Sequence, residues 1–161
     1  MPADLHLAAT WRQTHIGHWL RLALDRFDNR VAALMTLDPD LPLGLSNLVA
    51  RGQVGAAHIH ITRHLAVEGA RLTDLARRAG MTKQAMGTLV TQCEAWGMVV
   101  RMPDPQDARA RRICFTETGL AWLHAYQSAV AQAQQELQAA VGAEVATVLA
   151  LGLEAYAGDG A

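Results

Sequence analysis

Apolar side chains recur every three or four positions along much of the chain. Between residues 16 and 35 they form the single face of an amphipathic helix, and Pro39 and Pro42 then prevent its continuation. Ser46 is expected to cap a short turn after these prolines. Residues 53–66 carry β-branched side chains that leave helix and strand both possible on pattern alone, and we interpret this segment as a helix.

Two short helices with recognisable ends are predicted in the middle of the chain. Thr73 has the character of an N-cap, and Gly80 is expected to close the first helix. Thr82 is the expected cap of a second helix, which runs to about Trp96 and stops at Gly97. Two capped helices joined by a short turn that contains glycine form a helix-turn-helix unit.

The hydrophobic period changes after this unit. Residues 98–101 and 111–115 are predicted to be paired strands, and the stretch between them (MPDPQDARA) indicates a long hairpin loop because it holds two prolines and two aspartates. Thr116 is expected to open a final helical region. The predicted fold class is therefore mostly α with an α+β wing, that is, a winged helix-turn-helix.

The two ends of the chain hold more apolar residues than a wing domain of about fifty residues can cover. These helices either wrap the domain or pair with a second chain. We expect residues 1–52 and 117–161 to form a helical dimerisation region, interrupted at Val141 and Gly142, and residues 53–116 to form the DNA-binding domain.

The net charge of −1 at first argues against a nucleic-acid partner, but the charges are unevenly distributed. Residues 71–112 hold eight basic and four acidic side chains, a net charge of +4, whereas the remainder carries −5. A basic block on an otherwise acidic chain is typical of a surface that binds phosphate.

The sequence from residue 53 to 123 resembles the MarR family of winged-helix regulators. The resemblance is carried by LTDLARRAGMTKQAMGTLVTQCEAWGMVVR and by PDPQDARARRICFTETG, which is similar to the family's wing signature. It implies a homodimer with intertwined terminal helices that binds a pseudo-palindromic operator in double-stranded DNA. Gly87 and Thr88 depart from the larger polar or basic residues of many members, so base preferences are not transferred.

The second helix of the helix-turn-helix unit is expected to read DNA. Its apolar face should be buried, and its polar face should enter the major groove, where Gln84 and Thr88 are the predicted base readers. Lys83, the only lysine, is expected to meet phosphate, while Thr82 caps the helix and its amides can hold a phosphate. Gln92 lies on the same polar face. The expected core residues are Ala85, Met86, Leu89, Val90 and Cys93.

The predicted hairpin supplies further DNA contacts. Arg109 is expected near its tip and suited to insertion into the minor groove. Asp107 would repel phosphate, so we expect it to orient Arg109 or to brace the loop. Arg111 and Arg112 alternate across the strand, so only one should face DNA, and we choose Arg111. Arg101 completes the expected set.

The resemblance also implies a small aromatic effector bound between the terminal helices and the wing domain. Trp11, His15, Trp19 and His58 are candidate wall residues, because a ligand pocket combines apolar surface with a few polar groups. His60 and His64, like His15 and His18, lack an additional cysteine or acid at ligand spacing. We therefore expect neither a metal nor a cofactor.

Two alternatives remain within the same fold. A redox-responsive regulator needs a reactive, partly exposed thiolate, but Cys93 and Cys114 are both expected to be buried. A protein-interaction module without DNA binding would suit the near-neutral total charge but not the basic block. An enzyme is not expected, since no nucleophile elbow, phosphate loop or HExxH pattern occurs. With no apolar run of membrane-spanning length and no signal peptide, we expect a cytoplasmic protein with no membrane partner.

Overall fold

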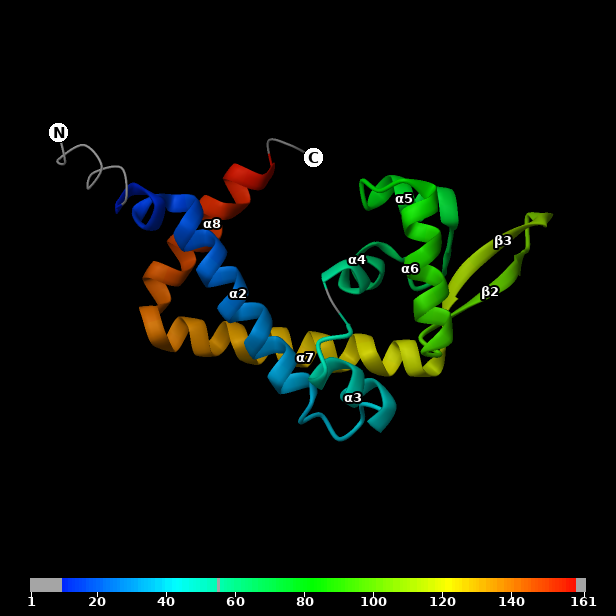
Figure 1. Ribbon diagram of the computed structural model, residues 1–161, viewed down its shortest axis with the longest axis horizontal. Coiled ribbons are helices and arrows are strands. Elements are labelled where there is room, and N and C mark those ends of the chain that lie inside the picture. The colour runs from blue at the N-terminus through cyan, green and yellow to red at the C-terminus, as the bar shows by residue number, and fades with distance from the viewer. Residues whose placement is uncertain (1–9, 55, 159–161) are drawn as a thin grey trace. The chain divides into compact units, whose positions relative to one another are not determined.

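The computed structural model describes residues 10–54 and 56–158, and these fall into two compact units (Figure 1). One unit lies within Met1–Leu34 and Ala129–Ala161, and the other is Met35–Ser128. The central unit is larger than the segment 53–116 that the sequence assigned to DNA binding, because α3 (Leu43–Ala50) and the first half of α7 (Glu117–Val141) belong to it.

The described part of the central unit is a winged helix-turn-helix, as predicted. Its helices α4 (Ala56–His64), α5 (Leu72–Arg78) and α6 (Lys83–Ala95) pack around a core that includes the start of α7. The largest fully buried side chains all belong to this unit and contribute the apolar area that holds it together; they are Trp122, Ile61, Leu75, Met86, Met98, Ile113, Val90 and Cys93.

Several predicted helix ends are confirmed. The hydroxyl of Thr82 accepts a hydrogen bond from the Ala85 amide at 3.2 Å and caps α6, as its short polar side chain suggested. Gly80 and Gly97 follow α5 and α6 with φ of +62° and +72°, a conformation in which other side chains are strained. Helix α2 (Ile16–Met35) has the predicted bounds.

Other predicted ends are wrong. Thr73 lies inside α5, whose N-cap is Arg71, because the preceding residues are extended in a strand and enter the helix earlier. Ser46 lies inside α3 behind its N-cap Pro42, and its hydroxyl donates to the Thr36 carbonyl at 3.4 Å. The segment 53–66 does contain a helix, but α4 is shorter than expected.

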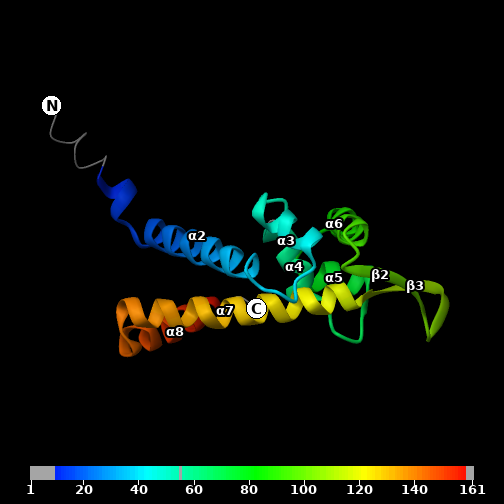
Figure 2. The ribbon, with the colours of Figure 1, turned by 90° about the horizontal axis from the view of Figure 1, so that it is seen from below.

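The wing is a three-stranded antiparallel sheet in the order β1-β3-β2. Strand β1 (Ala70–Arg71) was not foreseen, since two residues carry no detectable period. Strands β2 (Val99–Asp104) and β3 (Asp107–Phe115) pair with Val99 opposite Phe115 and Arg101 opposite Ile113. In both views the hairpin extends beyond α5 and α6 (Figures 1 and 2).

The predicted long hairpin loop is wrong, because the strands continue to a tight turn at residues 105 and 106. Pro103 lies within β2, opposite Arg111, next to an irregularity in the register. Proline lacks the N–H that a central strand needs, but β2 is an edge strand and tolerates it. Pro103 therefore indicated an edge strand, whereas Pro105 lies in the turn.

The start of α7 packs directly on the end of the helix-turn-helix unit. Thr116 donates its hydroxyl to the Gly97 carbonyl and its amide to the Met98 carbonyl, and its hydroxyl oxygen accepts from the Gly119 amide at 3.0 Å. A Cβ on Gly119 would lie 1.9 Å from the Met98 carbonyl oxygen. Only glycine allows this approach of two backbone segments.

In the other unit, α2 is joined to the second half of α7 by a bidentate ion pair. Arg30 donates from Nε and Nη2 to the two carboxylate oxygens of Glu136 at 2.6 and 2.7 Å. Helix α7 ends at Val141, where the predicted break occurs, and α8 (Ala143–Gly158) follows after Gly142.

Among the described residues, no single helix is long and apolar enough to cross a membrane. Helices α7 and α8 meet that criterion only when taken together, and they are bent by 118° at their junction.

Replacing Gly119 by alanine should destabilise the central unit. The added methyl group meets a backbone oxygen that cannot rotate away, and overpacking of this kind costs about 1–3 kcal/mol. Gly87→Ala is the matched control, since its Cβ would make an ordinary 3.7 Å contact with Leu72 and the helix would gain about 0.5–1 kcal/mol. Thermal unfolding followed by circular dichroism should show a lower Tm for the first variant only; equal Tm values would contradict the close packing.

The Arg30–Glu136 pair should make stability dependent on acid pH. The Arg30 hydrogen bonds lower the pKa of Glu136 to about 2, from an ordinary value of 4.5. A depressed carboxylate pKa contributes stability above the unfolded-state value, and the contribution is lost as pH falls from about 4.5 towards 2. Urea unfolding should therefore show Glu136→Gln less stable than the wild type at pH 7, with the difference shrinking across that window. Asp25→Asn, which breaks the exposed Arg21–Asp25 pair, is the control and should have little effect.

Candidate nucleic-acid interface

The outward face of α6 is polar and exposed, as the sequence predicted. Lys83, Gln84, Thr88 and Gln92 are all exposed, while Met86, Val90 and Cys93 are fully buried on the opposite face. The prediction that Ala85 belongs to the core is wrong, because Ala85 is exposed in the first turn of α6; Leu89 is half-buried. The four polar residues are thus available to a duplex.

The threonine hydroxyls on α6 are already used as donors. Thr88 donates to the Gln84 carbonyl at 3.2 Å, and Thr91 donates to the Gly87 carbonyl at 3.0 Å. A hydroxyl has one proton and two lone pairs, so the Thr88 oxygen is left as an acceptor beside its methyl group. In this rotamer Thr88 suits a base amino group or a thymine methyl group.

Gln92 is held by a side chain that sequence reasoning assigned elsewhere. Its Oε1 lies 2.8 Å from Nε2 of His58, which is on α4 and buried. The His58 ring also packs on Trp96, with 4.5 Å between ring centroids. The separation of 34 positions between His58 and Gln92 explains why no local pattern could reveal the contact.

The turn end of the wing hairpin is fixed by a pair that the sequence did not identify. Arg71 Nε, on β1, donates to Asp104 Oδ2 at 2.6 Å, and the Asp104 side chain is only 4% exposed. Asp104 Oδ1 accepts from the Gln106 amide at 2.9 Å in the hairpin turn. These hydrogen bonds lower the pKa of Asp104, so the carboxylate stays charged and anchors the turn.

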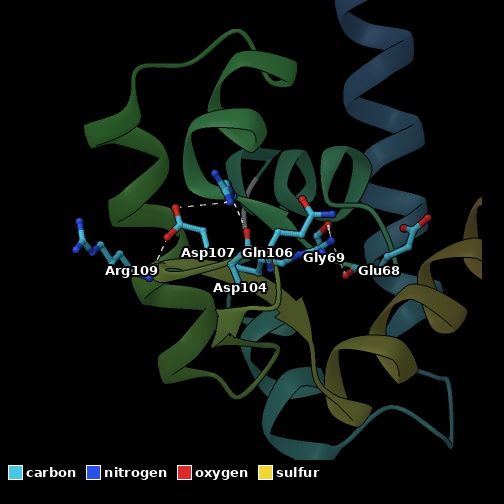
Figure 3. Close-up of polar contacts among 8 residues, drawn as sticks. Glu68, Gly69, Asp104, Gln106, Asp107 and Arg109 are labelled. Carbon is cyan, nitrogen blue, oxygen red and sulfur yellow. Dashed lines mark hydrogen bonds and ion pairs between the residues drawn. The ribbon is translucent and has the colours of Figure 1, made fainter.

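Asp107 braces the backbone rather than the guanidinium of Arg109. Its Oδ1 accepts from the Arg109 amide at 3.0 Å, and its Oδ2 lies 3.9 Å from Arg71 Nη2. Figure 3 shows the Arg109 side chain directed away from the Asp107 carboxylate. Arg109 is exposed and lies on β3, three residues beyond the turn rather than within a long loop.

The other wing arginines differ in their contacts. Arg101 donates to Glu94 and, at 3.3 Å, to Thr91 Oγ1, so it joins β2 to α6. Arg112 donates to the carbonyls of Glu68 and Gly69 at 2.9 and 2.8 Å. Arg111 is exposed, and no side-chain hydrogen bond or ion pair to another described residue engages it. The expected alternation of Arg111 and Arg112 is therefore present.

The four candidate effector residues lie in different units. Trp11, His15 and Trp19 belong to the terminal-helix unit, where Trp11 and Trp19 are more than half exposed and the Trp11 and His15 rings are 5.8 Å apart. His58 belongs to the central unit and is occupied by Gln92 and Trp96. Their grouping into one pocket stays a prediction.

The two cysteines differ in exposure. Cys93 is fully buried, and burial raises the pKa of its thiol to about 12. Cys114 is half-buried, not buried as expected, because on the central strand β3 it lies beside Gly69, which offers no side chain to cover it. Among the described residues, no group of three histidine, cysteine or acidic side chains is placed to hold a metal ion.

Comparison with known proteins agrees with this architecture. The MarR family model matches residues 54–110, which include α4, the helix-turn-helix unit and most of the wing. Over this segment the chain is similar to the MarR family. No curated protein shows significant sequence similarity to it.

Solved MarR-like structures share the fold over nearly the whole chain. A mutant of S. aureus MepR is 16% identical with a TM-score of 0.63, covering 90% of this chain and 98% of its own. The transcriptional repressor CouR, bound to a 23-mer DNA duplex, is 18% identical with a TM-score of 0.60, covering 98% and 97%. Bordetella bronchiseptica BpsR, described with regulation of its DNA binding by 6-hydroxynicotinic acid, is 18% identical with a TM-score of 0.60, covering 92% and 96%.

The anchoring role of Asp104 predicts a local effect on the wing turn. Asp104→Ala removes the acceptor of the Gln106 amide, whose hydrogen exchange should accelerate about three- to ten-fold. Asp107→Ala is the matched control, since it should accelerate the Arg109 amide and leave that of Gln106 largely unchanged. Both rates are measurable by NMR exchange spectroscopy. Unchanged exchange at Gln106 in Asp104→Ala would show that the carboxylate does not hold the turn.

Proposed function

We propose that this protein is a homodimeric, sequence-specific transcriptional regulator that represses by binding a pseudo-palindromic operator. The observation that carries the proposal is the exposed face of α6, whose side chains include Lys83, Gln84 and Thr88, on the same unit as a braced hairpin with Arg109 exposed. A helix of this kind fits the major groove, and an arginine on a wing fits the minor groove. The duplex bound to CouR, which has the same fold, supports this proposal.

Within this proposal the residues have separate roles. Gln84 and Thr88 read base edges, Lys83 and the capped N-terminus of α6 hold a phosphate, and Arg109 enters the minor groove. Arg111 adds a phosphate contact on the wing. Arg101 and Asp107 act by holding the hairpin, because both are engaged by protein groups.

The apolar surface of the unit made of α2, α8 and the end of α7 is the argument for a dimer. Many of its large apolar side chains are exposed, which is unfavourable for a lone chain in water, and a second copy of the same helices would cover them. The proposed interface residues are Ile16, Trp19, Leu22 and Leu24 on α2 with Val145, Val148, Leu149, Leu151, Leu153 and Tyr156 on α8.

A small aromatic effector is the proposed signal. In BpsR, a protein of this fold, 6-hydroxynicotinic acid regulates DNA binding. Trp11, His15 and Trp19 offer aromatic surface on the terminal helices of this chain. An effector that binds the DNA-incompetent form more tightly would release the operator.

A redox-responsive regulator is less well supported. The Cys93 thiol is fully buried with a raised pKa, and a thiol is reactive as its thiolate. A protein-interaction module without DNA binding would not require the exposed basic wing. Gel-shift titration with duplexes selected from a random pool distinguishes it from the proposed regulator, since absent or salt-independent binding would exclude the latter.

Two substitutions should separate affinity from specificity. Arg109→Ala should weaken binding to every duplex and lower the slope of log K against log salt by about 1, whereas Gln84→Ala should change the selected sequence with little effect on that slope. Arg26→Ala, which removes the same charge from exposed α2, is the control and should bind normally. Footprints should show half-sites about 34–36 Å apart, and sedimentation should give the mass of a dimer. An Arg109→Ala protein with wild-type affinity would remove the wing from the proposal.

A further inference from the structure

His58 is fixed at the junction between α4 and the end of α6. It is 9% exposed, and its ring packs on Trp96, the C-cap residue of α6, with an interplanar angle of 52°. The ring thus has a defined position relative to the outer face of α6.

The two ring nitrogens of His58 have different surroundings. Nε2 lies 2.8 Å from Gln92 Oε1, whereas Nδ1 is buried without a hydrogen-bond partner among the described residues. A neutral imidazole carries one proton. Placing that proton on Nε2 lets it donate to the Gln92 carbonyl oxygen and leaves only a lone pair unpaired, whereas placing it on Nδ1 would bury an unpaired N–H. The surroundings therefore favour Nε2 as the donor.

This bond fixes the orientation of the Gln92 carboxamide. A glutamine that rotates freely can present either its oxygen or its NH2 group to a ligand. With Oε1 held by His58, the NH2 group points away from the imidazole, and Gln92 is exposed. The side chain is thereby restricted to donating hydrogen bonds.

We propose that His58 is a positioning residue for DNA binding, which holds Gln92 so that its NH2 group donates to a phosphate of the duplex. The inference rests on the proposed function. Phosphate is the expected acceptor because Gln92 lies nine residues after Lys83, about 13 Å along the helix axis, whereas base edges are met by the N-terminal residues. Phosphate oxygens accept hydrogen bonds only, so an unheld carboxamide would be correctly oriented only part of the time.

A double-mutant cycle tests the proposal. His58→Phe keeps a ring beside Trp96 but removes the donor, and Gln92→Ala removes the carboxamide. Each should weaken binding to a mixed-sequence duplex of about 30 base pairs by roughly three- to ten-fold, without changing the salt slope, because no charge is lost. The double variant should bind no more weakly than Gln92→Ala. If the two effects multiply, His58 acts independently of Gln92 and the proposal fails.

A surface variant keeps the test decisive if His58→Phe does not fold. Gln92→Glu retains an oxygen for His58 but replaces the NH2 group by a carboxylate oxygen, so it should bind the duplex more weakly than Gln92→Ala. Wild-type affinity of Gln92→Glu would overturn the proposal. In the free protein, 15N NMR should show the His58 proton on Nε2, and a proton on Nδ1 would also overturn it. Absence of duplex binding by the wild type would instead refute the proposed function itself.

Discussion

The close approach of the first turn of α7 to Met98 is the constraint on which the rest of the central unit depends. At this point α6 has just ended, β2 begins, β3 has returned and α7 starts. Thr116 bonds to the carbonyls of both Gly97 and Met98, and Gly119 allows the backbones to touch. The end of α6 and the start of the hairpin are thereby both held against the first turn of α7, and the proposed DNA surface depends on that arrangement.

The acidic residues of the wing hold the hairpin turn in place. Asp104 and Asp107 reduce the positive charge near the proposed DNA surface, which is unfavourable for phosphate binding. Asp104, however, accepts a backbone amide of the turn, Asp107 accepts the Arg109 amide at the start of β3, and Arg71 lies close to both carboxylates. The hairpin turn has little apolar surface to fix it, so charge-assisted hydrogen bonds do so instead.

The features that the sequence predicted correctly depend on interactions between residues close together in the chain. Thr82, Gly80 and Gly97 were correctly placed, because a cap or a left-handed residue depends on a few neighbouring positions. Strand β1 was missed because two residues show no period, and the hairpin was mistaken for a loop because the edge position of Pro103 is a property of the sheet. The partners of Arg71, Gln92 and Arg112 lie 33 to 44 residues away, so only the fold brings them together.

The count of basic residues therefore overstates the charge available to DNA. Among the described contacts, Arg71, Arg77 and Arg101 are each paired with a carboxylate, and Arg112 is held by two carbonyls. Paired guanidinium groups contribute to the long-range field only together with their partners, whose charges cancel most of it at a distance. Four exposed basic side chains between residues 71 and 112 have no carboxylate or carbonyl partner among the described contacts and are left to bind phosphate: Arg78, Lys83, Arg109 and Arg111. A surface with so few free cations gains little binding free energy from counterion release. In the proposed complex, a neutral donor such as Gln92 would therefore contribute only through a well-oriented hydrogen bond to phosphate.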